Sequence, residues 1–172
     1  IAYVFDIQNL SVISSFNYEG EGWGICYNGE SLIMSNGTSS ISVRDPESFE
    51  VLREVSVSDD LGNKINKINE LECINTVEGP RVLANIWQDD RIVLFDPSNG
   101  SLLGDFDASI FSSKHSNGVN NVLNGIAFHN STEFWITGKN WSSMYLVSMT
   151  NLSGTEENNC FVGCDENDNM AL

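Results

Sequence analysis

The stretch Gly20-Glu21-Gly22-Trp23-Gly24 opens a unit of about 51 residues that occurs three times along the chain. Two later stretches open the other copies, Asn69-Glu70-Leu71-Glu72 and Leu123-Asn124-Gly125-Ile126-Ala127. Each opening leads into a short apolar run, a turn and a second apolar run. Repeats of this length with several short strands per unit are typical of β-propeller blades.

The pattern predicts four strands in a complete unit. First strands are expected at 24–27, 71–74 and 125–128, and second strands at 32–35, 83–86 and 134–137. Third strands at 41–44 and 92–95 each end in an Asp-Pro turn, and fourth strands follow at 49–55 and 101–106. The sequence therefore predicts an all-β propeller.

The first residues match only the outer half of such a unit, with strands expected near 2–5 and 10–13. We therefore expect the chain to begin inside a blade and to hold about three and a half blades. Because a propeller closes its ring with at least about four blades, and position 1 is not Met, we expect N-terminal blades to be missing. The predicted domains are a partial propeller over 1–153 and a polar, disordered tail over 154–172.

The composition indicates which classes of binding partner are favoured. The 172 residues are 41% hydrophobic, enough for a core, and contain no long apolar run of the kind that spans a membrane. A formal charge of −16 disfavours nucleic acid and anionic membrane surfaces and favours cationic ligands. An acidic surface that only maintains solubility is the simpler alternative.

Cysteines and glycosylation sequons give a weak secretory signal. Cys26 and Cys73 occupy equivalent first-strand positions in neighbouring units, where small buried side chains are wanted, and we predict free thiols there. Cys160 and Cys164 lie close together in the tail, where a local disulfide is possible. Four sequons begin at Asn36, Asn130, Asn140 and Asn151. A chain this rich in Asn, Ser and Thr contains about that many by chance.

The motifs that open the three repeats predict a functional site at one end of the propeller axis. Because the innermost strands of a propeller line its axis, Glu21, Glu70 and Asn124 should converge at one end of it. The ends of the second strands add Trp87 and Lys139, with Trp141 just beyond. Carboxylates can transfer protons, amides can fix a polar substrate, and a lysine can stabilise an oxyanion.

Other chemistries have less support in the sequence. The two histidines, His115 and His129, are too far apart in the pattern to suggest a metal-ligand pair, so we expect no metal and no cofactor. A Gly-x-Ser-x-Gly nucleophile turn is absent from the sequence. Core packing between blades is the alternative role for the tryptophans.

These motifs, in this order over about 19–147, resemble the glutaminyl cyclases of the plant and bacterial type. The stretches that carry the resemblance are Gly20-Glu21-Gly22-Trp23-Gly24, 32–37, Asn69-Glu70-Leu71-Glu72, Ala84-Asn85-Ile86-Trp87, 123–127 and Thr137-Gly138-Lys139-Asn140-Trp141. The resemblance implies a five-bladed propeller that converts N-terminal glutamine of peptides or proteins to pyroglutamate and releases ammonia, without zinc. It also implies a secreted protein or one of the secretory pathway, and we expect a monomer.

The resemblance further implies roles for individual residues. Glu21 would transfer protons, and Glu70 would either bind the substrate ammonium or share that role. Lys139 would stabilise negative charge on the γ-carbonyl oxygen. Amide groups of the substrate would be held by Asn69 and Asn124, and the pocket wall would be formed by Trp23, Trp87 and Trp141.

The chain departs from the family pattern at several places. A Phe-Thr-Gln-Gly-like segment of the N-terminal blades has no counterpart, Asn36 stands where Asp is usual, and Asn140-Trp141-Ser142 replaces a motif that usually ends in Pro. This chain alone is therefore expected to be an incomplete catalyst. The alternatives are a non-catalytic propeller that binds or scaffolds, and a decayed relative of the cyclases.

Overall fold

Strands make up nearly all the regular structure of the computed structural model, which describes residues 1–115, 120–149, 161–162 and 170–171. A hairpin of β1 (Ala2–Phe5) and β2 (Val12–Phe16) comes first. The first four-stranded sheet has the order β3 (Ile25–Tyr27), β4 (Leu32–Ser35), β5 (Ser40–Arg44) and β6 (Val51–Ser56). The second contains β7 (Ile68–Thr76), β8 (Gly79–Ile86), β9 (Arg91–Phe95) and β10 (Leu102–Asp107).

The third sheet follows two short helical segments, α1 (Ser109–Ser112) and η1 (Ser113–His115). It is built from β11 (Leu123–Phe128), β12 (Glu133–Gly138), β13 (Ser143–Met149) and β14 (Phe161–Val162), and β15 (Met170–Ala171) also pairs with β13. All of these pairings are antiparallel. No helix in the described part of the chain has the length and apolar character needed to cross a bilayer.

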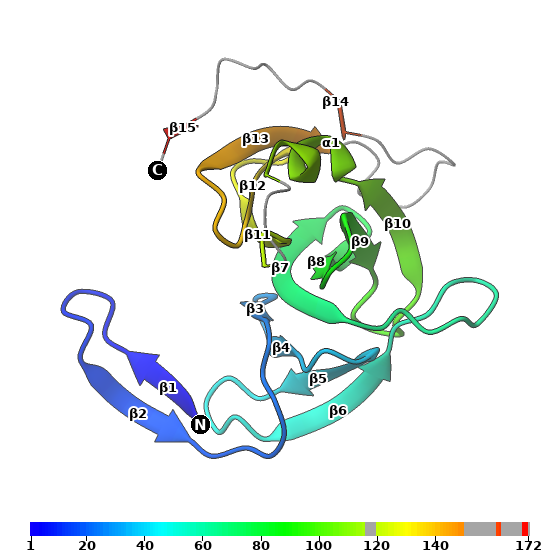
Figure 1. Ribbon diagram of the computed structural model, residues 1–172. Coiled ribbons are helices and arrows are strands. Elements are labelled where there is room, and N and C mark those ends of the chain that lie inside the picture. Colours follow the sequence, from blue (N-terminus) through cyan, green and yellow to red (C-terminus); the bar gives the residue numbers. More distant parts are fainter. Residues whose placement is uncertain (116–119, 150–160, 163–169, 172) are drawn as a thin grey trace.

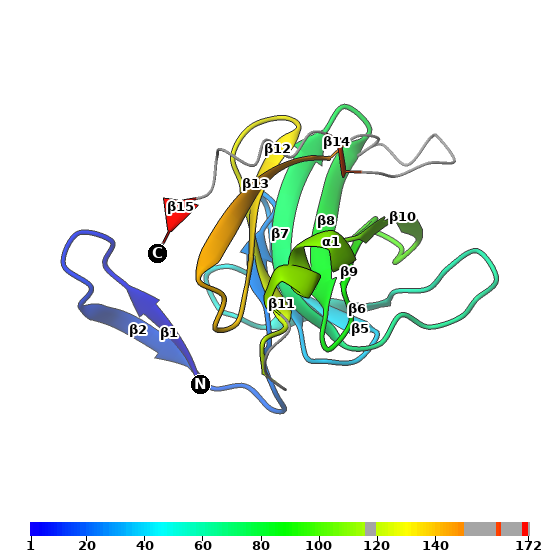
Figure 2. The ribbon, with the colours of Figure 1, turned by 45° about the horizontal axis from the view of Figure 1, so that its top comes forward.

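The three sheets form an arc, with β3, β7 and β11 on its inner side and β6 and β10 outside (Figure 1). The hairpin β1–β2 and strand β15 both lie on the open side of this arc, as the tilted view also shows (Figure 2). Each sheet is a propeller blade, and the hairpin is the outer half of one more. The predicted all-β propeller with about three and a half blades is confirmed.

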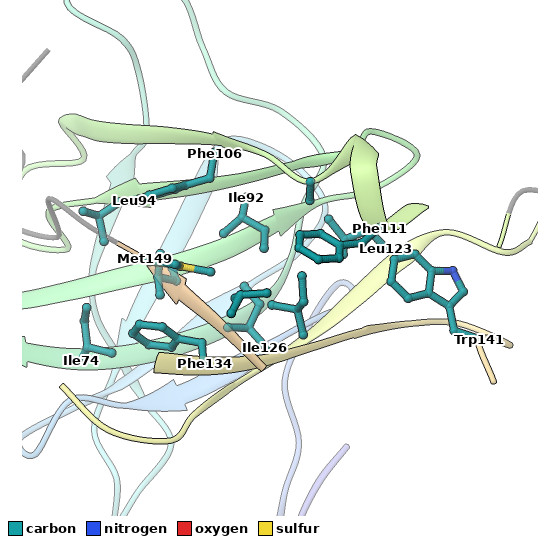
Figure 3. Packing of buried hydrophobic residues seen from close by; sticks show 14 residues of the cluster. Ile74, Ile92, Leu94, Phe106, Phe111, Leu123, Ile126, Phe134, Trp141 and Met149 are labelled. Carbon is teal, nitrogen blue, oxygen red and sulfur yellow. The ribbon is translucent and has the colours of Figure 1, made fainter. Parts of the chain in front are cut away.

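The blades pack against one another through two apolar clusters, one on each side of the second sheet. Alternation along β9 shows how: Ile92 and Leu94 enter the cluster shared with the third sheet, while Val93 and Phe95 enter the cluster shared with the first. All four side chains are fully buried, because successive residues of a strand point to opposite faces and both faces are covered. Apolar side chains of the middle blade therefore pack against both neighbouring blades. Figure 3 shows the cluster between the second and third blades.

A disulfide joins Cys26 of β3 to Cys73 of β7. The prediction of free thiols at these two positions is wrong. The inner strands of neighbouring blades lie side by side near the axis, which brings the two Cα atoms to 5.5 Å, within the range that a disulfide bridges. The bond is a covalent link between the first two complete blades.

Two short strands of the C-terminal region, β14 and β15, are described, and both pair with β13. The rest of 150–172 lies outside the described residues, as do Cys160 and Cys164 and the Asn151 sequon. The disorder expected for 154–172, and the local disulfide considered there, remain predictions.

Candidate active site

The starts of the inner strands and the ends of the second strands meet at one end of each blade. Antiparallel register produces this arrangement: Ile25 pairs with Met34, Ile68 with Ile86, and Leu123 with Gly138. Each opening motif therefore lies beside the end of its own second strand, as the repeat predicts. We call this end of the blades the mouth.

Glu21, Trp23, Trp87 and Lys67 form a row at the mouth, which we call the indole row. The Trp23 Nε1–H donates to Oε2 of Glu21 at 2.7 Å. The Trp23 and Trp87 rings meet edge to face, with centroids 5.4 Å apart, and the Lys67 Nζ lies 5.9 Å from the centre of the Trp87 ring. Three of the predicted site residues are thus brought together from two blades. Lys67 is an addition that the sequence analysis missed.

The turn after each second strand contains one residue with a left-handed backbone. These residues are Gly37, Gln88 and Asn140, with φ of 80°, 59° and 60°. At Gly37 the missing side chain makes room for an indole, since a Cβ there would lie 2.6 Å from the Trp23 ring. Glycine at this turn therefore lets the Trp23 ring pack against the backbone while its Nε1–H donates to Glu21.

A cavity of about 170 Å³ beside Trp23 is lined by residues of the first complete blade and by Ala2 of β1. Its wall includes Tyr18, Met34 and Phe49 together with the glycines on either side of the indole. Arg44 supports this wall, because its guanidinium lies 4.7 Å from the Phe49 ring centre and donates to the Phe49 carbonyl. The indole row thus borders a concave, mostly apolar space, as ligand sites commonly do.

Two β-bulges shape the mouth in the second and third blades. Asn69 and Glu70 together stand opposite the single residue Asn85, and Asn124 and Gly125 stand opposite Thr137. A bulge adds an unpaired residue and redirects the side chains beside it, and bulges are frequent next to functional sites. The predicted residues Asn69, Glu70 and Asn124 all lie on these bulges.

Side chains of the second blade cap the free inner edge of β11. The backbone N–H of Gly125 donates to Oδ1 of Asn85 at 2.9 Å, that of Ile126 to Oε2 of Glu70 at 2.9 Å, and that of Phe128 to Oε1 of Glu72 at 3.2 Å. These bonds satisfy donors that no neighbouring strand pairs. Glu70 therefore fixes the third blade and, through it, the bulge that carries Asn124.

Glu70 is a perturbed carboxyl. Burial, assisted by the nearby charge of Glu72, raises its pKa to about 7, although the N–H groups of Ile126 and Leu71 act in the opposite direction. Burial also raises the pKa of Glu72. A carboxyl with a pKa near neutrality can both accept and return a proton, so Glu70 suits the proton-transfer role, and only its ionised form can pair with an ammonium.

The free energy of unfolding should depend on the ionisation of Glu70. Because the pKa is higher in the folded state than in the unfolded state, the contribution of Glu70 to stability is greatest at low pH and is lost as pH rises through about 7. We expect a loss of at most about 3 kcal/mol between pH 4.5 and 8, which Glu70→Gln removes. Urea unfolding across this range measures it. Glu47→Gln, at an exposed glutamate, is the control that should keep the wild-type dependence, and an unchanged slope in Glu70→Gln would contradict the assignment.

Gly24 allows the first two blades to approach at the mouth. Its N–H donates to Oγ of Ser35 at 2.8 Å, and the same Oγ donates to the backbone carbonyl of Asn69. A Cβ on Gly24 would lie 2.2 Å from that carbonyl oxygen. The hydroxyl of Ser35, which is fully buried, thus ties β4 to the bulge of the second blade.

Gly24→Ala should therefore destabilise the protein by about 2–3 kcal/mol, because a backbone atom must move to admit the methyl group. Gly29→Ala is the comparison: its added carbon meets no atom within 4 Å, and only its left-handed backbone, φ 97°, opposes it. Its cost should be about 1 kcal/mol. Thermal unfolding of both variants measures the difference. Equal stabilities would argue against the close contact.

The remaining predicted residues belong to the third blade. Asn124 is half-buried on its bulge, and the Lys139 side chain is exposed and forms no ion pair within the described part of the chain. Trp141 is only 6% exposed and stacks on His115 with ring centroids 4.5 Å apart. Figure 3 shows Trp141 at one end of the cluster, beside Phe111 and Leu123. Trp141 thus has the inter-blade packing position that the sequence analysis weighed as its alternative.

Within the described ranges, no three His, Cys, Asp or Glu side chains lie in an arrangement that could bind a metal ion. The histidines contact aromatic rings: His115 stacks on Trp141 and hydrogen-bonds the Tyr145 hydroxyl, and His129 meets Trp135 edge to face. Sequence reasoning missed Lys67, Glu72 and Asn85 as residues of the mouth. Glu72 stands inside the opening motif Asn69-Glu70-Leu71-Glu72 and Asn85 inside the stretch Ala84-Asn85-Ile86-Trp87, whereas the only signal for Lys67 was its place two residues before an opening motif.

Fold and mouth together define the class of protein: a β-propeller whose inner-strand ends present carboxylates, indoles and amides. The glutamine cyclotransferase family model matches residues 1–149, and the chain belongs to that family. It is 34% identical over 165 residues to a glutaminyl-peptide cyclotransferase of Arabidopsis thaliana, covering 91% of this chain and 49% of that protein.

Solved structures agree with this membership. The crystal structure of Myxococcus xanthus glutaminyl cyclase superposes with a TM-score of 0.74 at 29% identity, covering 89% of this chain and 61% of that one. The β-propeller domain of Cps50 (Swd1) from Myceliophteria thermophila matches at 0.51 and 16% identity, over 87% of this chain and 44% of that domain, and supports the fold alone. The chain therefore spans about half to three fifths of the length of its cyclase relatives.

Proposed function

We propose that the protein is a glutaminyl-peptide cyclotransferase, which converts the N-terminal glutamine of peptides or proteins to pyroglutamate and releases ammonia. The observation that carries the proposal is the hydrogen-bonded pair of Glu21 and Trp23, placed edge to face with Trp87 at the mouth. Membership of the glutamine cyclotransferase family supports it. A propeller that only binds or scaffolds peptides has no specific observation in its favour.

The chemistry needs a base near a free α-amine. A protonated amine has a pKa near 8 and cannot attack, so a carboxylate that removes its proton produces the nucleophile. The nitrogen then bonds to the δ-carbon of the side-chain amide, and the carbonyl oxygen takes up negative charge. When the carbon–nitrogen bond to the leaving group breaks, the same carboxyl returns the proton to the departing nitrogen, and ammonia leaves. The ring nitrogen, which still carries one proton more than the lactam needs, loses it to the carboxylate, and the ammonia takes it up as ammonium. No oxidant, reductant or water is consumed.

Residues of the mouth have distinct proposed roles in these reaction steps. Glu21 carries the proton, and the indole N–H of Trp23 holds its carboxylate in position. Trp23 and Trp87 form an apolar wall that keeps the glutamine side chain folded toward its own amine, which makes ring closure effectively unimolecular. Glu70 holds the third blade through Ile126 and provides a second carboxyl, either for the ammonium or for the proton.

Four further residues have proposed roles. Asn69 and Asn124, on the two bulges, hold amide groups of the substrate. Lys139 stabilises the developing negative charge on the carbonyl oxygen. Trp141, packed on His115, supports the third blade at the mouth and contributes to the wall only through it.

We also propose the compartment, the oligomeric state and the cofactor requirement of the enzyme. The link between Cys26 and Cys73 suits an oxidising compartment, which supports a secreted protein or one of the secretory pathway. The net charge of −16 agrees with substrates that carry a free ammonium group. We propose that the protein acts as a monomer, without metal or other cofactor.

A panel of three peptides tests the activity in the longest reading frame that contains this chain. A peptide with N-terminal glutamine should release ammonia, whereas its N-acetylated form and a peptide with internal glutamine should not, because neither offers a free amine beside the amide. Release should persist in EDTA. Release from the acetylated peptide would indicate an amidase, and no release from any peptide by a folded protein would favour the scaffold.

A further inference from the structure

Lys67 has a fixed place in the mouth that the proposed chemistry does not use. Its N–H donates to the Gly37 carbonyl at 3.1 Å, and its own carbonyl accepts the N–H of Trp87 at 2.8 Å. Its backbone is left-handed, with φ 63°, a conformation that is uncommon outside glycine and asparagine. Unusual backbone held by contacts on both sides is a common feature of functional positions.

The ammonium of Lys67 is available to a ligand. The side chain is exposed, lies over Trp87, and forms no ion pair within the described ranges. The chain has 24 acidic and only 8 basic side chains, so an unpaired cation among the indoles is a local exception to an acidic surface. An acidic peptide approaching the mouth would be repelled elsewhere and attracted here.

The position of Lys67 in the indole row fixes which part of a substrate it can reach. Glu21 and Lys67 are the first and last members of this series of contacts, with the two indoles between them. The contact distances limit the path between carboxylate and ammonium to about 15 Å, which an extended peptide covers in about four residues. A glutamine held at Glu21 would therefore bring the second to fourth residues of its peptide past Lys67.

We propose that Lys67 is a specificity-determining residue that binds a carboxylate side chain on the second to fourth residue of the substrate. The inference rests on the proposed cyclase function and deepens it. Substrates with Asp or Glu soon after the N-terminal glutamine are then preferred, despite the acidic protein. An exposed charge pair of this kind corresponds to a preference of about threefold to fivefold.

Two C-terminally amidated peptides test the proposal. Both begin with glutamine, and their second to fourth residues are Glu in one peptide and Gln in the other. The readout is the ratio of their kcat/KM values in the longest reading frame, which cancels any general loss of activity. We expect a ratio of about three to five at low salt, falling toward one at high salt. Lys67→Met should reduce the ratio to about one, Lys67→Glu should invert it, and Lys67→Arg should keep it.

Lys64→Met is the matched control, because Lys64 is an exposed lysine three residues earlier in the same loop, and it should leave the ratio as in the wild type. A wild-type ratio of one, or a preference that persists in Lys67→Met, would overturn the role of Lys67 while leaving the cyclase intact. Turnover of neither peptide by the wild type would overturn the proposed function and the inference with it.

Discussion

Glu21→Gln is expected to lower kcat/KM for a peptide with N-terminal glutamine by about 10²–10⁴-fold, the usual contribution of a positioned acid–base group. The amide cannot take the proton from the attacking amine or return it to ammonia. Its oxygen can still accept the Trp23 Nε1–H, so the indole row and the fold should persist. Ammonia release measures the rate, and the thermal unfolding midpoint checks the fold.

Glu19→Gln is the matched control, since Glu19 is an exposed carboxylate two residues earlier and should retain full activity. Glu70→Gln separates the two roles left open for Glu70. If Glu70 only binds the ammonium, its variant should raise KM and keep most of kcat; if it shares proton transfer, kcat should fall as well. A folded Glu21→Gln protein with wild-type turnover would remove Glu21 from the chemistry.

Loss of the disulfide should have the largest effect on stability. The double variant Cys26→Ser, Cys73→Ser is expected to lower the free energy of unfolding by about 2–4 kcal/mol. The bond closes a loop with a sequence separation of 47 residues, for which the chain-entropy model gives about 4 kcal/mol. It also covalently links β3 to β7, so its loss should loosen the first blade against the second. Guanidinium unfolding under oxidising conditions measures the difference.

Peptide mapping of the unreduced protein is the companion measurement, and it should recover Cys26 and Cys73 in one cross-linked fragment. Reduction of the wild type should reproduce the loss seen in the double variant. A double variant as stable as the oxidised wild type would show that the disulfide does not stabilise the blades. Recovery of both residues as free thiols would show that the bond is absent.

The blade architecture could be predicted because its signals are local. Short apolar runs, turns such as Asp45-Pro46 and Asp96-Pro97, and a constant spacing between second strands predict both the strands and their order in each blade. The strands of the structure agree with the expected ranges within a few residues. Convergence of the opening motifs followed from the propeller, whose innermost strands line one axis, and antiparallel pairing places each opening beside the end of its own second strand.

The features that were not predicted depend on neighbours across blades. The Cys26–Cys73 link and the caps that Asn85 and Glu72 place on β11 involve residues from adjacent sheets, and no local pattern records how closely those sheets approach. The bulge at Asn69 and Glu70 is a departure from regular pairing, which a repeat analysis smooths over. These lateral contacts explain why the second blade positions so much of the mouth.

The mass and yield of the product formed from a peptide with N-terminal glutamine in EDTA, using the longest reading frame that contains this chain, test the proposed cyclotransferase activity. We expect a peptide lighter by one ammonia, with its N-terminus blocked as pyroglutamate, and one ammonia released for each peptide converted. Glu21→Gln should yield almost none. An unmodified peptide after incubation with the folded wild type, or a product with N-terminal glutamate in place of the ring, would contradict it.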